Sequence, residues 1–295
     1  MEKRILIVSP VRNEADHIER VAAAVAAQTA PPSTWLVLDD GSDDGTPDLL
    51  RQLESRVPAM RVVAPPRDGA EKARDRLAIA APPRAFNRAL ATVDWRDYDF
   101  IGKLDGDIEL PPDYFERLLA EFERRPVLGI AGGTLVERFG DDWRPLHIPH
   151  EHHVHGALRL YSRDCFEAIG GVDERLGWDT IDETYARMKG YETRSFPSIV
   201  ARHHRHWGSA DGRLRGRARH GRCAYITRYG LGWALLRAAK IARARPVGLS
   251  GAAFLYGYLR AALGRTSRIE DEAFRRFLRA ELRLRVLTQL RVRRA

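Results

Sequence analysis

Short apolar runs alternate with amphipathic stretches over the first 125 residues, and this alternation restricts the folds that the chain can adopt. The runs that predict buried strands are RILIVSP (4–10), TWLVLDD (34–40), MRVVAPP (60–66) and DYDFIGKLD (97–105). Helical spacing of apolar residues, or a proline in the first turn, predicts helices at 14–28, 47–56, 83–93 and 111–125. Strands that alternate with helices are typical of a mainly parallel sheet with helices on both faces, so we predict an α/β fold.

The pattern changes after residue 130. The sequence predicts a strand or edge segment at 131–140, a strand at 157–161, and helices at 163–169 and 182–189. A last strand lies in SFPSIVARHHRHWG (195–208), and from residue 213 onward the chain has a helical, Arg-rich, amphipathic pattern. We therefore predict a domain over residues 1–210 and a helical, Arg-rich extension over residues 211–295.

Charge is distributed unevenly behind the net value of +9. Residues 201–295 hold 23 Lys and Arg against 5 Asp and Glu, whereas residues 1–200 hold 26 against 35. A basic C-terminal third on an acidic body predicts contact with an anion such as phospholipid, nucleotide diphosphate or nucleic acid. Nearly all of these basic residues are Arg, so a coding bias toward Arg is an alternative explanation of the basic C-terminal third.

Compartment and membrane topology are constrained by a few features. Cys165 and Cys223 show neither metal-type spacing nor a disulfide framework, which favours a reducing compartment. The apolar run in MEKRILIVSP is too short for a signal peptide, and the uncharged stretch 246–259 is shorter than the roughly 20 residues that span a bilayer. We expect a cytoplasmic protein that can bind the inner face of the cytoplasmic membrane as a peripheral protein.

Polar residues follow three of the predicted strands at the points where the strands end. They are Pro10, Arg12 and Asn13 after the first strand, Asp39 and Asp40 after the second, and Asp105 and Asp107 after the fourth. In open α/β sheets, ligands bind at these carboxyl ends. The first turn, VSPVRNEAD, has no glycine and so lacks the dinucleotide-binding fingerprint. A divalent metal on carboxylates is the obvious substitute for a glycine turn in holding phosphates.

Each of these clusters has a plain structural alternative. Asp105 and Asp107, separated by one glycine, can share Mg²⁺ or Mn²⁺ bridged to two phosphates, but Asp and Gly are also common turn residues. Asp39 and Asp40, followed by Gly and Ser, equally suit a turn and a helix N-cap. The combination of the three clusters is more informative than any one of them.

The runs VSPVRNE, VLDDGSDDGT and KLDGDIELPPDYFERLL, in this order, resemble the family 2 glycosyltransferases of the GT-A fold over roughly residues 4–210. The resemblance implies a GT-A catalytic domain with a nucleotide-binding half (1–110) and an acceptor half (111–210). It also implies transfer of a sugar from a nucleotide-diphosphate donor to an acceptor hydroxyl, with inversion at the anomeric carbon. Polysaccharide or lipid-linked glycan synthesis is the expected setting.

The same resemblance implies roles for individual residues. Pro10, Arg12, Asn13, Glu14 and Asp40 would border the nucleoside, with Arg84 as a further basic contact and Asp105 close to the nucleotide sugar. The pair Asp105 and Asp107 would hold Mn²⁺ or Mg²⁺ on the diphosphate. A histidine after the last strand, His203 or His204, would complete the metal site. A looser group of histidines, at 147, 150, 152, 153 and 155, precedes the acceptor region and shows no zinc-site spacing.

Inverting transfer also needs a base for the acceptor hydroxyl. The family places an Asp for this purpose at the start of a helix, after a loop with Trp or Gly, and GWDTIDETYARMKGY (177–191) resembles that segment. Asp182 takes the base position, Glu183 and Asp179 remain alternatives, and Trp178 would contact the acceptor. The order of acids departs from the usual pattern, and all three also suit the first turns of a helix.

The C-terminal segments 232–244 and 252–265 interleave Arg with Leu, Trp and Tyr at helical spacing. They fit an interfacial helix on anionic lipid, or helices that pack on the catalytic domain or on another subunit of a homo-oligomer. The expected partners are a nucleotide-sugar donor and a glycan or lipid-linked saccharide acceptor, which the resemblance implies, and an anionic membrane surface, which the C-terminal segments suggest; no nucleic acid is expected.

Two other functions remain alternatives at this point. A nucleotidyltransferase or sugar-nucleotide pyrophosphorylase also uses acids and a metal, but it would need a glycine- and Lys/Arg-rich loop after the first strand. A non-catalytic nucleic-acid-binding protein would use the Arg-rich extension and bind any duplex with steep salt dependence. That function leaves the acids at the three strand ends unexplained.

Overall fold

The computed structural model describes residues 3–64, 76–146, 152–205, 212–243 and 246–292, with side chains up to residue 284. The chain divides into two compact units. The first comprises residues 1–174 and 189–206, and the second comprises residues 175–188 and 207–295.

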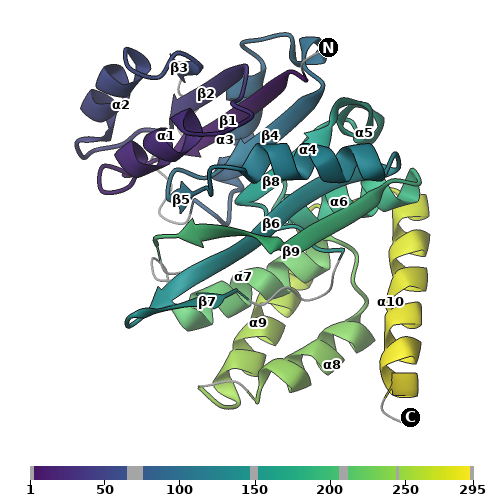
Figure 1. The fold of residues 1–295 in the computed structure, drawn as a ribbon. Coiled ribbons are helices and arrows are strands. Elements are labelled where there is room, and N and C mark those ends of the chain that lie inside the picture. Colours follow the sequence, from purple (N-terminus) through teal and green to yellow (C-terminus); the bar gives the residue numbers. More distant parts are fainter. Residues whose placement is uncertain (1–2, 65–75, 147–151, 206–211, 244–245, 293–295) are drawn as a thin grey trace. The chain divides into compact units, whose positions relative to one another are not determined.

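The first unit begins with a parallel half-sheet (Figure 1). Its strands β1 (Ile5–Val11), β2 (Thr34–Asp39), β3 (Met60–Val63) and β4 (Phe100–Leu104) lie in the order β3-β2-β1-β4, and every adjacent pair is parallel. The intervening helices are α1 (Ile18–Ala26), α2 (Thr46–Glu54) and α3 (Ala81–Leu90). The alternation predicted from the sequence is therefore present, and all of the polar strand ends in this half lie along one edge.

Mixed pairing continues the sheet beyond β4. Strand β8 (Leu158–Ser162) pairs antiparallel with β4, and β6 (Leu128–Phe139) pairs antiparallel with β8 and parallel with β9 (Glu192–His203). Two short strands were not predicted: β5 (Ile108–Glu109), which pairs with β9, and β7 (Asp142–Pro145), which forms a hairpin with β6. The segment expected as a strand or edge at 131–140 lies inside the sheet, between β8 and β9.

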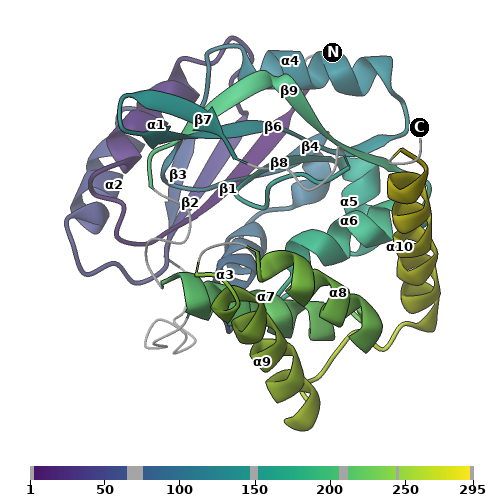
Figure 2. The same cartoon turned by 90° about the horizontal axis from the view of Figure 1, so that it is seen from below.

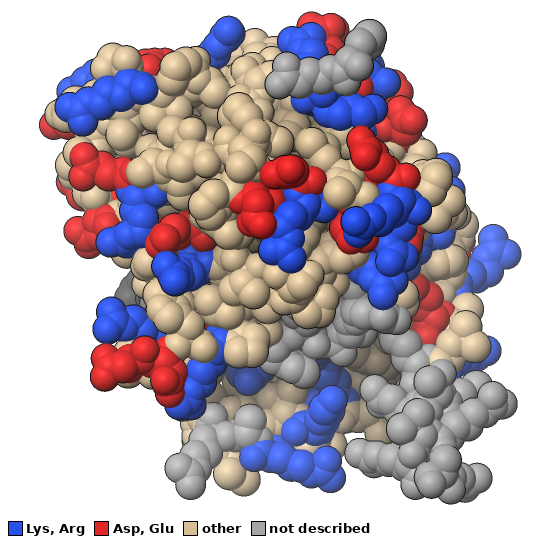
Figure 3. Space-filling model, viewed as in Figure 1, with Lys and Arg blue, Asp and Glu red and all other residues tan. Residues whose placement is uncertain are grey.

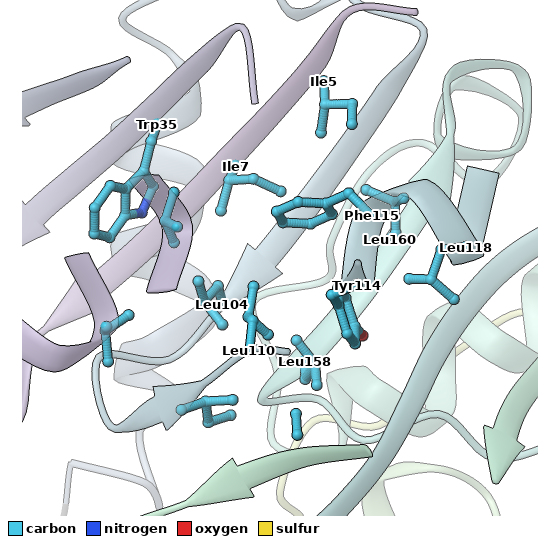
Figure 4. Close-up of a cluster of buried hydrophobic side chains, with 14 of the residues drawn as sticks. Ile5, Ile7, Trp35, Leu104, Leu110, Tyr114, Phe115, Leu118, Leu158 and Leu160 are labelled. Carbon is cyan, nitrogen blue, oxygen red and sulfur yellow. The ribbon is translucent and has the colours of Figure 1, made fainter. Parts of the chain in front are cut away.

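Helices α1 and α4 (Tyr114–Arg124) cover one face of the sheet, α3 lies on the opposite face, and α5 (Arg163–Ile169) packs against β4, β6 and β8 (Figure 2). Figure 4 shows Ile5 and Ile7 of β1 packed with Trp35 and Phe115 in the core under α1 and α4. The one polar atom of Trp35 is satisfied, because its Nε1 donates to Ser9 Oγ at 2.8 Å. Strand alternation sends the equally buried neighbours of these β1 residues to the face covered by α3.

The second unit is helical. It contains α6 (Trp178–Met188), α7 (Arg213–Ile226), α8 (Leu231–Ile241), α9 (Leu249–Leu263) and α10 (Glu272–Val292). Helices α7 and α9 cross at Gly221 and Gly257, where an added Cβ would lie 1.8 Å from a backbone oxygen of the other helix. Ile181 of α6 packs with Phe274 and Leu278 of α10. None of the helices in the described ranges combines the length and the apolar character needed to cross a membrane.

Candidate active site

Two loops at the carboxyl edge of the sheet lock together through their side chains. Asn13, which follows β1, adopts a left-handed backbone with φ of 53°. Its side chain exchanges two hydrogen bonds with Asp43 of the β2–α2 loop, at 2.7 and 3.0 Å, and its backbone N–H donates to Ser42 Oγ at 3.0 Å. The next residue, Glu14, donates its backbone N–H to Thr46 Oγ1 at 2.8 Å. Residues after β1 and β2 are thus held in one fixed arrangement.

Asp40, at the end of β2, is surrounded by guanidinium groups. Arg88 Nη2 lies 2.7 Å from its carboxylate, Arg76 forms a second ion pair with it, and Arg12 donates to its carbonyl oxygen at 3.4 Å. Burial, together with the nearby charges of Arg12 and Arg88, lowers the pKa of Arg76 to about 10. Arg84 is exposed on the first turn of α3, one helical turn before Arg88. Three guanidinium groups therefore gather at the end of β2, and such a cluster suits an anionic ligand.

Asp105 and Asp107 lie between β4 and β5. Asp105 forms an ion pair with the buried Lys103, and its backbone N–H donates to the Ala157 carbonyl oxygen at 2.9 Å. Asp107 is buried, and its Oδ2 lies 3.4 Å from Nε2 of His203. The pairing of β5 with β9 produces this approach, because it sets Ile108 opposite His203 across the sheet.

His203 lies between two carboxylates. Its Nδ1 is 2.8 Å from Glu137 Oε1, on the side opposite Asp107. Burial alone would lower the pKa of His203, but the hydrogen bonds and charges of Asp107 and Glu137 outweigh burial and raise that pKa to about 9. For Asp107, burial favours the neutral acid, yet the contact with His203 and the charge of Arg205 hold its pKa below the usual value. The pair is therefore an imidazolium and a carboxylate at neutral pH.

Glu14 extends this cluster toward the first loop. Its Oε2 lies 2.6 Å from Arg205 Nη2, and the same guanidinium has its Nε 3.7 Å from Asp107 Oδ2. Burial, reinforced by the charges of Asp107 and Asp105, raises the pKa of Glu14 to about 8 in spite of Arg205. The sequence singled out neither Arg205 nor Glu137 as a site residue, although Arg205 directly follows the histidine pair.

The chemistry around Asp107 is compatible with a divalent cation. Its Oδ1 is buried and has no hydrogen-bond partner among the described residues. Within the same ranges, no three or more His, Cys, Asp or Glu side chains are arranged to hold a metal ion together. Mg²⁺ on phosphates commonly takes only one or two carboxylates, its other ligands being water and phosphate oxygens. A cation would give Asp107 Oδ1 its missing partner, and it would displace the proton from Nε2 of His203 if that nitrogen joined as a ligand, with Glu137 orienting the ring.

His204 faces a different set of groups. Its Nε2 lies 2.7 Å from Glu109 Oε2, its ring meets Trp143 edge to face at 5.4 Å, and its backbone N–H donates to the Asp107 carbonyl oxygen at 3.0 Å. Of the looser group of histidines, His147 and His150 lie outside the described residues.

The three acids considered as the base lie on α6, in the second unit. This helix starts at Trp178, four residues earlier than predicted, so all three belong to its first two turns. Gly177, which has a φ of +91°, precedes the half-buried Trp178. A Cβ added at Gly177 would lie 2.4 Å from Cys223 Sγ. Asp182 and Glu183 are buried, while Asp179 is half-buried. The choice of base among these acids stays a prediction.

Three comparisons with known proteins bear on the site. The model of the family described as "Glycosyl transferase family 2" matches residues 6–169. The succinoglycan biosynthesis protein ExoA of Rhizobium meliloti (strain 1021) is 27% identical over 192 residues, which cover 57% of this chain and 53% of that protein. The chondroitin synthase of Pasteurella multocida (strain Pm70) is 30% identical over 128 residues, covering 42% of this chain and 12% of that protein. The chain thus spans about half, or less, of the length of these relatives.

Solved structures of low identity share the fold. The mannosyltransferase PcManGT from Pyrobaculum calidifontis, in complex with GDP-Man and Mn²⁺, superposes with a TM-score of 0.57 at 19% identity, covering 97% of this chain and 81% of that one. S. aureus TarS 1–349, in complex with UDP-GlcNAc, gives a TM-score of 0.54 at 12% identity, with 90% and 73% covered. The predicted GT-A-type α/β fold is confirmed.

Proposed function

The chain belongs to glycosyl transferase family 2, as the sequence motifs predicted, and from that membership we propose that it transfers a sugar from a nucleotide-diphosphate donor to an acceptor hydroxyl. Nucleotide sugars are the ligands of the similar structures, namely GDP-Man and UDP-GlcNAc. The names of the relatives, a succinoglycan biosynthesis protein and a chondroitin synthase, support a role in polysaccharide synthesis, and a lipid-linked glycan is the alternative setting.

The observation that carries the proposal is the buried Asp107 carboxylate at the carboxyl edge of a GT-A-type sheet, whose Oδ1 has no hydrogen-bond partner in the part of the chain that the structure describes. Asp107, together with His203 and with Asp105 nearby, would hold Mn²⁺ or Mg²⁺ against the diphosphate. When bound, such a cation would act as a Lewis acid on the leaving group. Arg205, which contacts both Glu14 and Asp107, keeps positive charge beside these acids.

The guanidiniums around Asp40 would bind the nucleotide half of the donor. Arg88 and Arg76 fix the orientation of the Asp40 carboxylate, and Arg12 braces its backbone. The rigid Asn13 loop would border the nucleoside, because its hydrogen bonds to the β2–α2 loop leave it little freedom to move. Charged groups that are fixed before the ligand arrives need not be reoriented when it binds, which favours binding of an anion.

Inverting transfer then requires a proton acceptor on α6. As the acceptor oxygen bonds to the anomeric carbon, the bond from that carbon to the diphosphate oxygen breaks, and the hydroxyl proton passes to a carboxylate. Asp182 is the proposed carboxylate, with Glu183 and Asp179 as the alternatives, and Trp178 would contact the acceptor. This assignment rests on the family resemblance of residues 177–191.

A screen of nucleotide sugars by thermal stabilisation, with Mn²⁺, Mg²⁺ or EDTA, tests the proposal. We expect at least one donor to stabilise the protein only when a divalent metal is present, and metal-dependent hydrolysis of that donor. Asp107→Asn should abolish both effects, whereas Asp48→Asn, which changes an exposed carboxylate on α2, should abolish neither. If no nucleotide sugar stabilised the protein, or if Asp107→Asn retained full hydrolysis, the proposed function would be wrong.

A further inference from the structure

An apolar stripe runs along the exposed side of α9. Leu249, Ala252, Tyr256, Leu259 and Leu263 recur at intervals of three and four residues, and all five are exposed, with Leu263 reaching 85%. Such spacing places them on one side of the helix. The opposite side of α9 is buried, because its residues pack against α7 and α8. The stripe is therefore a second apolar face, for which the described part of the second unit provides no cover.

Helix α8 repeats this feature directly before α9. Leu231, Leu235 and Leu236 are exposed, the last at 69%, whereas Ala234 and Ala238 are buried in the cluster shared with α9. We refer to these exposed residues of both helices as the α8–α9 face: Leu231, Leu235, Leu236, Leu249, Ala252, Tyr256, Leu259 and Leu263. Scattered surface leucines are ordinary, but a set of this size on two packed helices is typical of an interaction surface.

The segment that contains α7, α8 and α9 carries charge of only one sign. Residues 212–269 contain 13 Lys and Arg and no Asp or Glu. Arg237 and Lys240 of α8, Arg243 just after it, and Arg260 of α9 are exposed beside the leucines, and Arg265 follows α9. Elsewhere, as Figure 3 shows for one side of the molecule, acidic and basic side chains are interspersed. An unbalanced cationic rim on an apolar face requires a partner that is anionic and apolar at once.

This requirement decides among the possible occupants. A second copy of the chain would bring two cationic rims together with no acid from residues 212–269 to offset the repulsion. A nucleic acid would match the charge but would leave seven large apolar side chains unused. A bilayer with anionic head groups matches both, because acyl chains accept the leucines and phosphates accept the guanidiniums.

We infer that the α8–α9 face is a membrane-binding surface that lies on an anionic lipid bilayer. Since α9 is packed along its opposite side, it would lie in the plane of the interface, with its leucines directed into the acyl boundary and Arg260 extended toward the head groups. The inference does not depend on the proposed transferase activity, because all of the residues that carry it belong to the second unit and none is in the candidate site.

Co-sedimentation of the purified full chain with liposomes tests this surface. We expect binding to vesicles with 30% phosphatidylglycerol in phosphatidylcholine, and much weaker binding to phosphatidylcholine alone. Leu236→Ser with Leu263→Ser should lower the affinity at least tenfold, since each leucine loses its apolar burial in the bilayer. Arg260→Gln with Lys240→Gln should lower binding to the anionic vesicles by about 25-fold, because each basic residue near such a surface contributes about fivefold.

Val127→Ser is the matched control, because Val127 is comparably exposed, at 57%, but lies in the first unit. It should bind vesicles like the wild type, and all variants should retain the wild-type circular dichroism. Absence of binding to the anionic vesicles, or equal loss in Val127→Ser, would overturn the inference. Light scattering gives a further test. If the wild type were a dimer, and the double leucine variant were a monomer that still bound vesicles, the face would belong to a contact with a second copy and the inference would be overturned. If the leucine pair failed to fold, the Arg260 and Lys240 pair would decide alone.

Discussion

Replacing Glu14 with glutamine should stabilise the metal-free protein at pH 8 and change its stability little at pH 4. Two effects on this carboxyl oppose each other. The ion pair with Arg205, at 2.6 Å, favours the carboxylate, whereas burial and the charges of Asp107 and Asp105 favour the neutral acid. Burial and the neighbouring acids together outweigh the charge of Arg205, so the pKa of Glu14 rises from 4.5 to about 8.

The sign of the effect on stability follows from the proton count. Between pH 4.5 and 8 the folded chain holds a proton on Glu14 that the unfolded chain releases, so unfolding becomes easier as the pH rises. The contribution is fully present below pH 4.5 and is lost as the pH passes 8. The full difference corresponds to at most about 5 kcal/mol, and relaxation around the partly exposed Arg205 reduces it, so we expect about 2–4 kcal/mol.

Urea unfolding at pH 4, 6 and 8 with EDTA, followed by far-ultraviolet circular dichroism, measures this difference. The free energy of unfolding of Glu14→Gln minus that of the wild type should grow steadily from pH 4 to pH 8. Glu19→Gln, at an exposed position on α1, is the control and should show no such trend. A difference that stays constant with pH, or one that favours the wild type as the pH rises, would show that the charge of Arg205 outweighs burial at Glu14.

Other perturbations give distinct results. Asp107→Asn should move the pKa of His203 from about 9 toward 6.5, because the substitution removes one of the two acids that raise this pKa. A histidine NMR titration in EDTA measures the shift, and an unchanged pKa would contradict the pairing of Asp107 with His203. Gly257→Ala should lower the free energy of unfolding by about 1–3 kcal/mol, because the added methyl group overpacks the α7–α9 crossing. Gly232→Ala, which has open space around it on α8, should leave that free energy unchanged or raise it by up to about 1 kcal/mol. Equal urea midpoints for these two glycine variants would argue against the crossing. Asn13→Ala should lower the free energy of unfolding by about 1–3 kcal/mol, because it removes two hydrogen bonds and strains a left-handed backbone. Asn13→Gly should recover the part of this loss that comes from backbone strain. An Asn13→Ala variant as stable as the wild type would rule out the locked loop.

The parallel half of the fold could be predicted because its signals are local. Strands such as β1 and β2 are buried on both faces and appear as continuous apolar runs, and their helices show amphipathic spacing or an N-terminal proline. Strand β5 has only two residues and β7 has a mostly exposed, polar pattern, so neither carries a sequence signal. Their positions are set by long-range pairing with β9 and β6, which no local pattern records.

The candidate site shows the same division. The rule that ligands bind at the carboxyl ends of parallel strands points to Asp40, Asp105 and Asp107 from the sequence alone. Arg88, Glu137 and Arg205 were not identified, because their partners lie 48 or more residues away along the chain. Residue type and spacing could suggest acids for a metal, but only the fold shows which basic side chains surround them.

Asp107 is proposed to support metal-dependent binding of a nucleoside diphosphate, and isothermal titration calorimetry measures this binding. The measurement titrates UDP and GDP into the wild-type chain with Mn²⁺ and again with EDTA, and repeats both for Asp107→Asn and for the control Asp48→Asn. We predict that one of the two nucleotides binds the wild type and the control only with Mn²⁺, and that Asp107→Asn weakens this binding at least tenfold. Binding that is as tight in EDTA, or as tight in Asp107→Asn, would contradict the claim.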